Sequence, residues 1–136
     1  MPRLIAALIR HGDYRQLRNT PSAHQPFPLN AEGEAQAQQA GSTLRRTIAE
    51  HDWSLCPDVD SSQWLRAWQT AQIIIEQLGD LFPAKPRLTG YDELAERGLG
   101  SAANLSVSAI AEIIHEDPRF EELPADWKSN SRFRLP

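Results

Sequence analysis

A short, uninterrupted apolar run, Leu4–Ile9, opens the pattern of hydrophobic positions along the chain. No polar residue interrupts it at alternate positions, which is typical of a strand covered on both faces, as in a parallel sheet. The run ends abruptly at Arg10-His11-Gly12. The polar stretch 14–29 that follows contains three prolines, and it predicts a loop.

Two later segments have the spacing of amphipathic helices. The first runs from Ala31 to about Ala49 and has Asn30 as its N-cap. The second runs from about Trp64 to Leu78 and stops at Gly79. The residues expected on the buried faces are Ala37, Gly41, Leu44 and Ile48 in the first helix, and Trp64, Trp68, Ala71, Ile75 and Leu78 in the second.

Weaker signals complete an alternation of strands and helices. Residues 56–62 and 83–88 are expected to form short strands. A third helix is expected to begin at Ser106 or Ser108 and to end before Pro118. Such an alternation favours an α/β fold with three layers, α/β/α, around a mostly parallel sheet.

The length of the chain, 136 residues, corresponds to one domain, so we expect residues 1–136 to fold as a single unit. From Asp117 to Pro136 the hydrophobic periodicity disappears and three prolines occur. This tail, 117–136, is therefore interpreted as a loop or linker segment.

Composition and charge narrow the class of function. The chain is 40% hydrophobic, and its 14 Lys and Arg against 18 Asp and Glu give a formal net charge of -4. This balance argues against nucleic acid or an anionic membrane as a partner bound through bulk charge. The single cysteine, Cys56, cannot form an internal disulfide, and no apolar run is long enough for a signal peptide or a membrane span. We expect a cytoplasmic protein.

Candidate chemistry gathers where the expected strands end, because open α/β sheets place their sites at the carboxyl ends of the strands. The first strand ends at Arg10-His11, and the helix after the second carries Arg66 in its first turn. Guanidinium groups match phosphate oxygens, and a histidine beside them can act as a nucleophile or as an acid or base. The alternative is that His11 is a hydrogen-bonded core residue and Arg66 a solvated one.

Four segments, in this order, resemble the motifs of one family. Residues 8–12 read Leu-Ile-Arg-His-Gly, and residues 29–37 read Leu-Asn-Ala-Glu-Gly-Glu-Ala-Gln-Ala. Residues 62–71 read Ser-Gln-Trp-Leu-Arg-Ala-Trp-Gln-Thr-Ala, and residues 94–100 read Leu-Ala-Glu-Arg-Gly-Leu-Gly. Together they resemble the histidine phosphatase superfamily, whose members have a phosphoglycerate-mutase-like fold.

The resemblance implies a role for each matching residue. His11 would be the nucleophile that takes the phosphoryl group, and Arg10 and Arg66 would bind its non-bridging oxygens. Glu96 would be the proton donor to the leaving oxygen. The expected activity is metal-independent hydrolysis of a phosphomonoester or of a protein phosphohistidine, without a cofactor. The expected partners are phosphorylated small molecules or phosphoproteins. A homodimer is a further possible outcome, because a sheet without its last strand would leave a central strand as an unpaired edge.

The sequence also departs from the family pattern. The family has a second histidine late in the chain, in a Gly-His-Gly or Ser-His-Gly segment, and none occurs here, because His24, His51 and His115 stand in other contexts. The sequence therefore resembles the first part of a longer protein, with the C-terminal part of the fold missing. Two other functions stay open: a phosphoglycerate mutase, and an inactive domain that binds a phosphorylated ligand or a protein.

Overall fold

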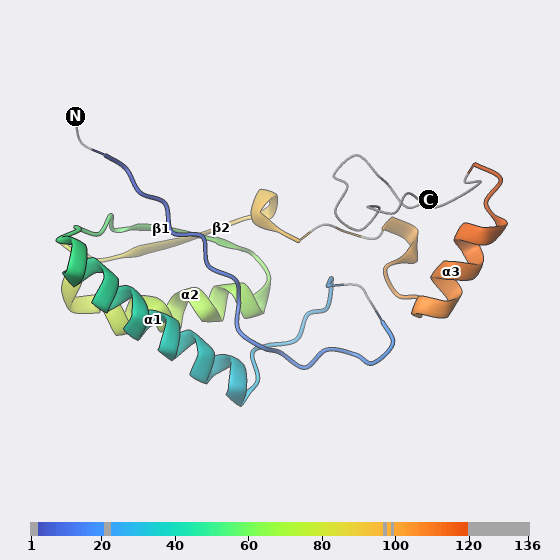
Figure 1. The fold of residues 1–136 in the computed structure, drawn as a ribbon, viewed down its shortest axis with the longest axis horizontal. Helices are drawn as coiled ribbons and strands as arrows, with labels where there is room; N and C mark the ends of the chain where they lie inside the picture. The colour runs from blue at the N-terminus through green and yellow to red at the C-terminus, as the bar shows by residue number, and fades with distance from the viewer. Residues whose placement is uncertain (1–2, 21–22, 97, 99, 120–136) are drawn as a thin grey trace. The chain divides into compact units, whose positions relative to one another are not determined.

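The computed structural model describes residues 3–20, 23–96, 98 and 100–119. These residues belong to two compact units, each described by itself (Figure 1). The first unit comprises Met1–Arg15 and Pro26–Ala95, and the second comprises Gln16–Gln25 and Glu96–Pro136. Most of the tail expected to be a linker, from residue 120 onward, lies outside the described residues.

A small parallel sheet forms one side of the first unit. Strand β1, Asp58–Ser62, pairs with strand β2, Arg87–Tyr91, and Val59 lies opposite Leu88. The prediction of strand 83–88 was wrong in its bounds. Pro83 and Pro86 lack the N–H donors that a ladder needs, so pairing begins only after them.

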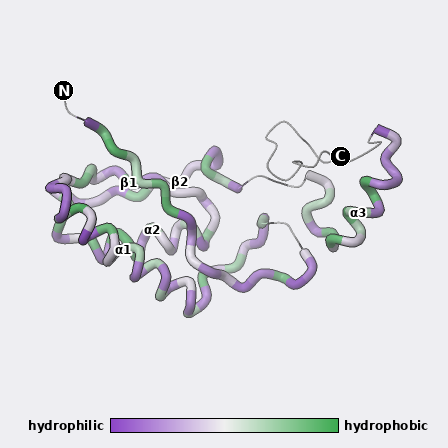
Figure 2. Tube along the Cα trace, viewed as in Figure 1, coloured by the Kyte–Doolittle hydropathy of each residue, from purple (hydrophilic) through white to green (hydrophobic). Residues whose placement is uncertain are grey.

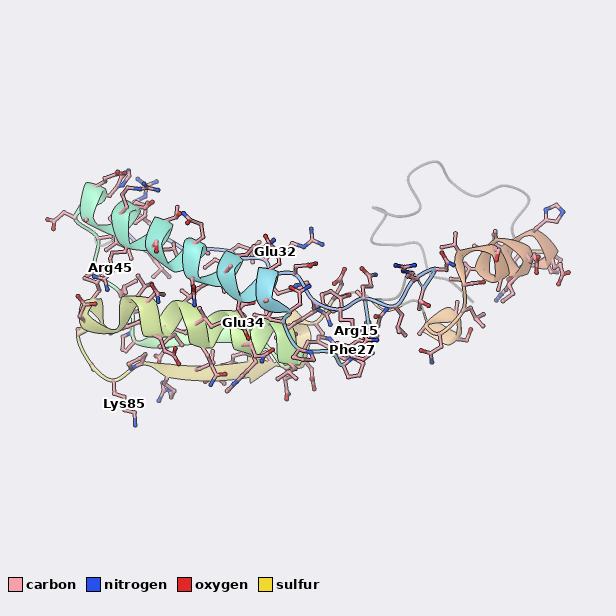
Figure 3. The ribbon with its side chains drawn as sticks, turned by 90° about the horizontal axis from the view of Figure 1, so that it is seen from below. Arg15, Phe27, Glu32, Glu34, Arg45 and Lys85 are labelled. Carbon is pink, nitrogen blue, oxygen red and sulfur yellow. The ribbon has the colours of Figure 1, made fainter. Side chains whose placement is uncertain are left out.

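Helix α1, Ala31–His51, covers one side of helix α2, Leu65–Leu78, and α2 lies between α1 and the strands (Figure 3). The predicted N-cap of α1 is confirmed, because the Asn30 side chain accepts a hydrogen bond from the Gly33 N–H at 2.8 Å. The core between the helices centres on Ile48, Ile74 and Leu78. The mixed α/β class with a parallel sheet is thus confirmed.

The most buried row of α2 differs from the predicted one. It consists of Arg66, Thr70, Ile74 and Leu78, each four residues apart. Trp68 and Ile75, expected to be buried, are only half-buried. The prediction followed the largest apolar residues, whereas α2 contacts other parts of the chain on more than one side. Two polar residues therefore occupy its most enclosed face.

Arg45 links α1 to the end of α2 (Figure 3). Its guanidinium donates to the Gln77 carbonyl at 2.6 Å and pairs with the Asp80 carboxylate. The hydrogen bond from Arg45 lowers the pKa of Asp80 below its ordinary value. Both side chains are exposed, so the contribution of this pair to stability is small.

The apolar segment Leu4–Ile9 does not form the strand that its composition predicts. In the described part of the chain no strand pairs with it, and its side chains face solvent: Leu4 is 92% exposed and Leu8 is 99% exposed. Figure 2 shows it as a continuous hydrophobic stretch running down to the first loop. Apolar side chains favour burial, but the sequence of this run does not determine which other segment packs against it.

The second unit contains helix α3, Val107–Glu116, whose first turn is capped by Ser106. The Ser106 hydroxyl accepts a hydrogen bond from the Ala109 N–H at 3.2 Å, so the cap is Ser106, one of the two serines that the sequence offered. Its small core consists of Ala102, Ile110 and Ile114. None of the helices in the described part of the chain combines the length and the apolar character needed to cross a membrane.

The first turn of α1 lies directly against the backbone that follows His11. A Cβ built on Gly33 would overlap the carbonyl oxygen of Asp13 and lie 2.8 Å from its carbonyl carbon. Conversely, a Cβ on Gly12 would lie 2.8 Å from the Cα of Gly33. The Asn30 N–H donates to the same Asp13 carbonyl at 3.2 Å. Two glycines therefore permit a backbone contact that fixes residues 12 and 13 on α1.

We expect Gly33→Ala to lower the free energy of unfolding by about 2–3 kcal/mol, because the new methyl group displaces the Asp13 backbone. The matched control is Gly79→Ala, where a Cβ meets nothing within 4 Å and the backbone is helical. That change should raise stability by about 0.5 kcal/mol. Urea denaturation of both variants provides the test, and equal stabilities would contradict the close contact.

Candidate functional site

The hydroxyl of Thr70 on α2 binds the backbone at Gly12, where the extended N-terminal segment ends. Thr70 Oγ1 accepts a hydrogen bond from the Gly12 N–H at 3.1 Å and donates one to the Arg66 carbonyl at 2.8 Å. Both bonds are buried. Thr70 lies one turn after Arg66 on the same face of the helix, so Gly12 is held beside the turn that carries Arg66. His11 is thereby placed next to this arginine.

His11 and Arg66 are in direct contact. The Nε atom of Arg66 lies 3.2 Å from Nε2 of His11, and His11 Nδ1 lies 2.7 Å from the Gly12 carbonyl oxygen. A guanidinium nitrogen only donates and a carbonyl only accepts. Both contacts are satisfied by one tautomer, with the proton on Nδ1 and the lone pair on Nε2. The geometry thus leaves a nucleophilic lone pair on the ring nitrogen that faces the guanidinium.

The guanidinium of Arg66 is enclosed by aromatic rings. Arg66 is only 1% exposed, and its Cζ lies 4.4 Å from the centroid of the Tyr14 ring and 5.5 Å from that of Trp64. Tyr14 also makes an edge-to-face contact with His11, at 5.4 Å between centroids. Aromatic faces stabilise a cation that has lost part of its hydration. These rings therefore hold both the arginine and the histidine in place.

Tyr14 itself stands at the base of the long loop. It pairs with Leu29 through an antiparallel bridge, and the Leu29 N–H donates to Gln69 Oε1 at 2.9 Å. Gln69 precedes Thr70 on α2, so two consecutive residues of this helix hold both ends of the loop. The same helix thereby orders the loop base, the histidine and the arginine.

Of the residues predicted from the sequence, His11 and Arg66 are brought together. Arg10 is exposed at the end of the extended segment, next to His11 in the chain. Glu96 belongs to the second unit, so its place beside His11 stays a prediction. Its backbone carbonyl accepts a hydrogen bond from His24 Nε2 at 2.8 Å.

Sequence reasoning missed the roles of Thr70, Gln69 and Tyr14. Thr70 and Gln69 lie inside the motif that carries Arg66. The spacing of four residues already places Arg66 and Thr70 on the same face of the helix. Tyr14 gave no such signal, because a tyrosine three residues after a histidine is consistent with any loop. Its contribution depends on the bridge to Leu29, which is a tertiary contact.

The arrangement suits an anionic group. A buried guanidinium, that of Arg66, and the exposed arginine next to His11 in the chain both carry positive charge. Among residues 3–20, 23–96, 98 and 100–119, no three His, Cys, Asp or Glu side chains gather closely enough to hold a metal ion.

Comparison with protein families extends the four motifs to nearly the whole chain. Residues 6–132 match the model of the histidine phosphatase superfamily, branch 1. The chain belongs to this superfamily. None of the curated proteins compared with it matches. Membership supports a phosphatase or mutase type of activity, and it accounts for the parallel α/β arrangement of the superfamily domain described above.

The contacts of His11 predict its tautomer. Long-range ¹H–¹⁵N NMR spectra at neutral pH should show the His11 proton on Nδ1, because Nε2 accepts from Arg66. His24 provides the internal contrast, since its Nε2 contacts a carbonyl oxygen and should carry the proton. A proton on Nε2 of His11 in the ligand-free protein would contradict the geometry.

Proposed function

We propose that this superfamily domain hydrolyses a phosphomonoester, or a phosphohistidine on a protein, through a phosphohistidine formed on His11 and without a metal ion. The observation that carries the proposal is the contact between His11 Nε2 and the buried guanidinium of Arg66. Phosphoryl transfer requires an in-line nucleophile and positive charge around three equatorial oxygens, and little other chemistry from the protein.

Binding of the substrate exchanges one partner of Arg66 for another. In the free protein Arg66 Nε donates to the His11 lone pair. In the complex, the donors of Arg66 turn to the phosphoryl oxygens and release that lone pair. Arg10 adds a second guanidinium from the adjacent position, and the aromatic rings keep the guanidinium of Arg66 in place.

The reaction then proceeds in two displacements. Nε2 of His11 attacks phosphorus, the bond to the leaving oxygen breaks, and Glu96 gives its proton to that oxygen. A water molecule next attacks the phosphohistidine, the phosphorus–nitrogen bond breaks, and the dihydrogen phosphate that forms afterwards gives up a proton that returns to the Glu96 carboxylate. The products are inorganic phosphate and the alcohol of a phosphomonoester, or the free histidine of a phosphohistidine substrate, and His11 and Glu96 return to their starting states.

We expect rapid quench with a ³²P-labelled substrate, in the presence of EDTA, to trap an acid-labile and base-stable label on the protein. His11→Ala should abolish the label, whereas His51→Ala should retain it, because His51 lies at the far end of α1. Label that persists in His11→Ala would move the nucleophile elsewhere. Turnover that is lost in EDTA and restored by a divalent ion would contradict the metal-independent mechanism.

The same experiment separates the two other functions. A phosphoglycerate mutase would pass the label to a second hydroxyl group faster than to water. An inactive domain would bind the phosphorylated ligand without acquiring label at all. Either result would replace hydrolysis as the function.

Replacing Arg66 should reduce turnover in a graded way. Arg66→Met keeps most of the buried stem but removes the charge, and it should raise the activation free energy by about 2–4 kcal/mol. Arg66→Lys should cost less, because a point charge remains but the two-pronged contact is lost. The control is Arg46→Met on the exposed side of α1. Steady-state kinetics provide the measurement, and unchanged kcat in Arg66→Met would exclude Arg66 from the mechanism.

A further inference from the structure

Within the second unit, a histidine far away in the sequence holds the backbone of Glu96. His24 Nε2 lies 2.8 Å from the Glu96 carbonyl oxygen, across 72 residues of chain. A carbonyl oxygen only accepts, so the imidazole donates from Nε2. The bond acts on the main chain of Glu96 and thus on the origin of its side chain.

Gly98, two positions after Glu96, lies close to the same ring. A Cβ built on Gly98 would lie 3.2 Å from Cε1 and 3.4 Å from Nε2 of His24. That separation is tighter than an ordinary van der Waals contact, so any larger residue at position 98 would push against the imidazole. The Glu96 carbonyl and Gly98 therefore both lie next to the His24 ring.

The loop that carries His24 is itself anchored. Gln25, only 4% exposed, accepts a hydrogen bond from the Leu17 N–H at 2.8 Å, which closes the loop. The Asn19 carbonyl accepts from the Val107 N–H at 3.2 Å, at the start of α3. His24 therefore projects from a loop tied at two points, which makes it a firm support for the segment of Glu96.

We infer that His24 is a positioning residue that sets the backbone of Glu96, the proton donor of the proposed reaction. The inference rests on the proposed function, because it acts through the role given to Glu96 there. His24 does not touch the reacting atoms in this account. Its effect is confined to the step in which the leaving oxygen receives a proton.

This confinement gives the inference a kinetic signature. A leaving group such as p-nitrophenolate departs without a proton, whereas an alkoxide needs one. His24→Ala should therefore lower kcat on an alkyl phosphate roughly ten-fold and change kcat on p-nitrophenyl phosphate less than about two-fold, with KM little altered. His24→Gln retains an N–H donor and should restore part of the loss.

The control is His51→Ala. His51 makes the same type of contact, from a ring nitrogen to the Thr47 carbonyl at 2.9 Å, but on α1. His51→Ala should leave kcat unchanged on both substrates. Thermal melts of all variants check the fold, and if His24→Ala is unfolded, His24→Gln and Gly98→Ala carry the same comparison of substrates.

A double-mutant cycle with Glu96→Gln decides the matter. Glu96→Gln alone should lower turnover of the alkyl substrate by at least a hundred-fold, and adding His24→Ala should then have no further effect. Suppose that Glu96→Gln shows this selectivity, but His24→Ala lowers kcat equally on both substrates or leaves kcat unchanged on both. The role of His24 is then overturned, and the proposed reaction stands. If Glu96→Gln shows no selectivity for the alkyl substrate, the proton donor of the proposed function is wrong, and His24 loses its role with it.

Discussion

The hydrogen bond between the Gly12 amide and the Thr70 hydroxyl is the contact on which the candidate site depends. It joins the extended segment 3–13, which forms neither a helix nor a strand, to the second turn of α2. The same hydroxyl donates to the Arg66 carbonyl, so one atom, Thr70 Oγ1, binds the backbone next to His11 and the backbone of Arg66. The glycine contact with α1 then fixes the other side of the segment. His11 and Arg66 are thus held in a fixed position relative to each other, although no strand in the described part of the chain pairs with residues 4–9.

A buried guanidinium is costly unless its surroundings compensate for lost water. Arg66 is almost fully enclosed, and the His11 lone pair and the faces of Tyr14 and Trp64 provide part of this compensation. The aromatic rings stabilise the positive charge without neutralising it. Phosphoryl transfer needs positive charge of this kind around the transferring group.

Local sequence signals predicted those features that depend on local physics. The Asn30 cap of α1 and the Ser106 cap of α3 follow from hydrogen bonds within a few residues, and both are confirmed. The pairing of His11 with Arg66 was expected at one edge of a sheet, and it occurs through α2 instead.

What sequence reasoning could not supply were contacts between distant residues. The composition of Leu4–Ile9 predicted a buried strand, but its side chains are exposed. Burial requires a segment that packs against the run, and the run itself does not determine that segment. The buried polar row of α2 escaped because apolar size was used as the guide to the inner face, whereas the contacts of Arg66 and Thr70 are polar. The support of Glu96 by His24 joins residues 72 positions apart and has no periodic signature.

The central claim is that Arg66 releases the His11 lone pair to a phosphoryl group. A crystal structure of the protein with vanadate, which takes the five-coordinate geometry of the transferring phosphoryl group, tests this most directly. The account predicts vanadium bonded to Nε2 of His11, with the Arg66 donors on the equatorial oxygens and the His11–Arg66 hydrogen bond broken. Vanadate bound away from His11, with the His11–Arg66 contact still intact, would contradict it.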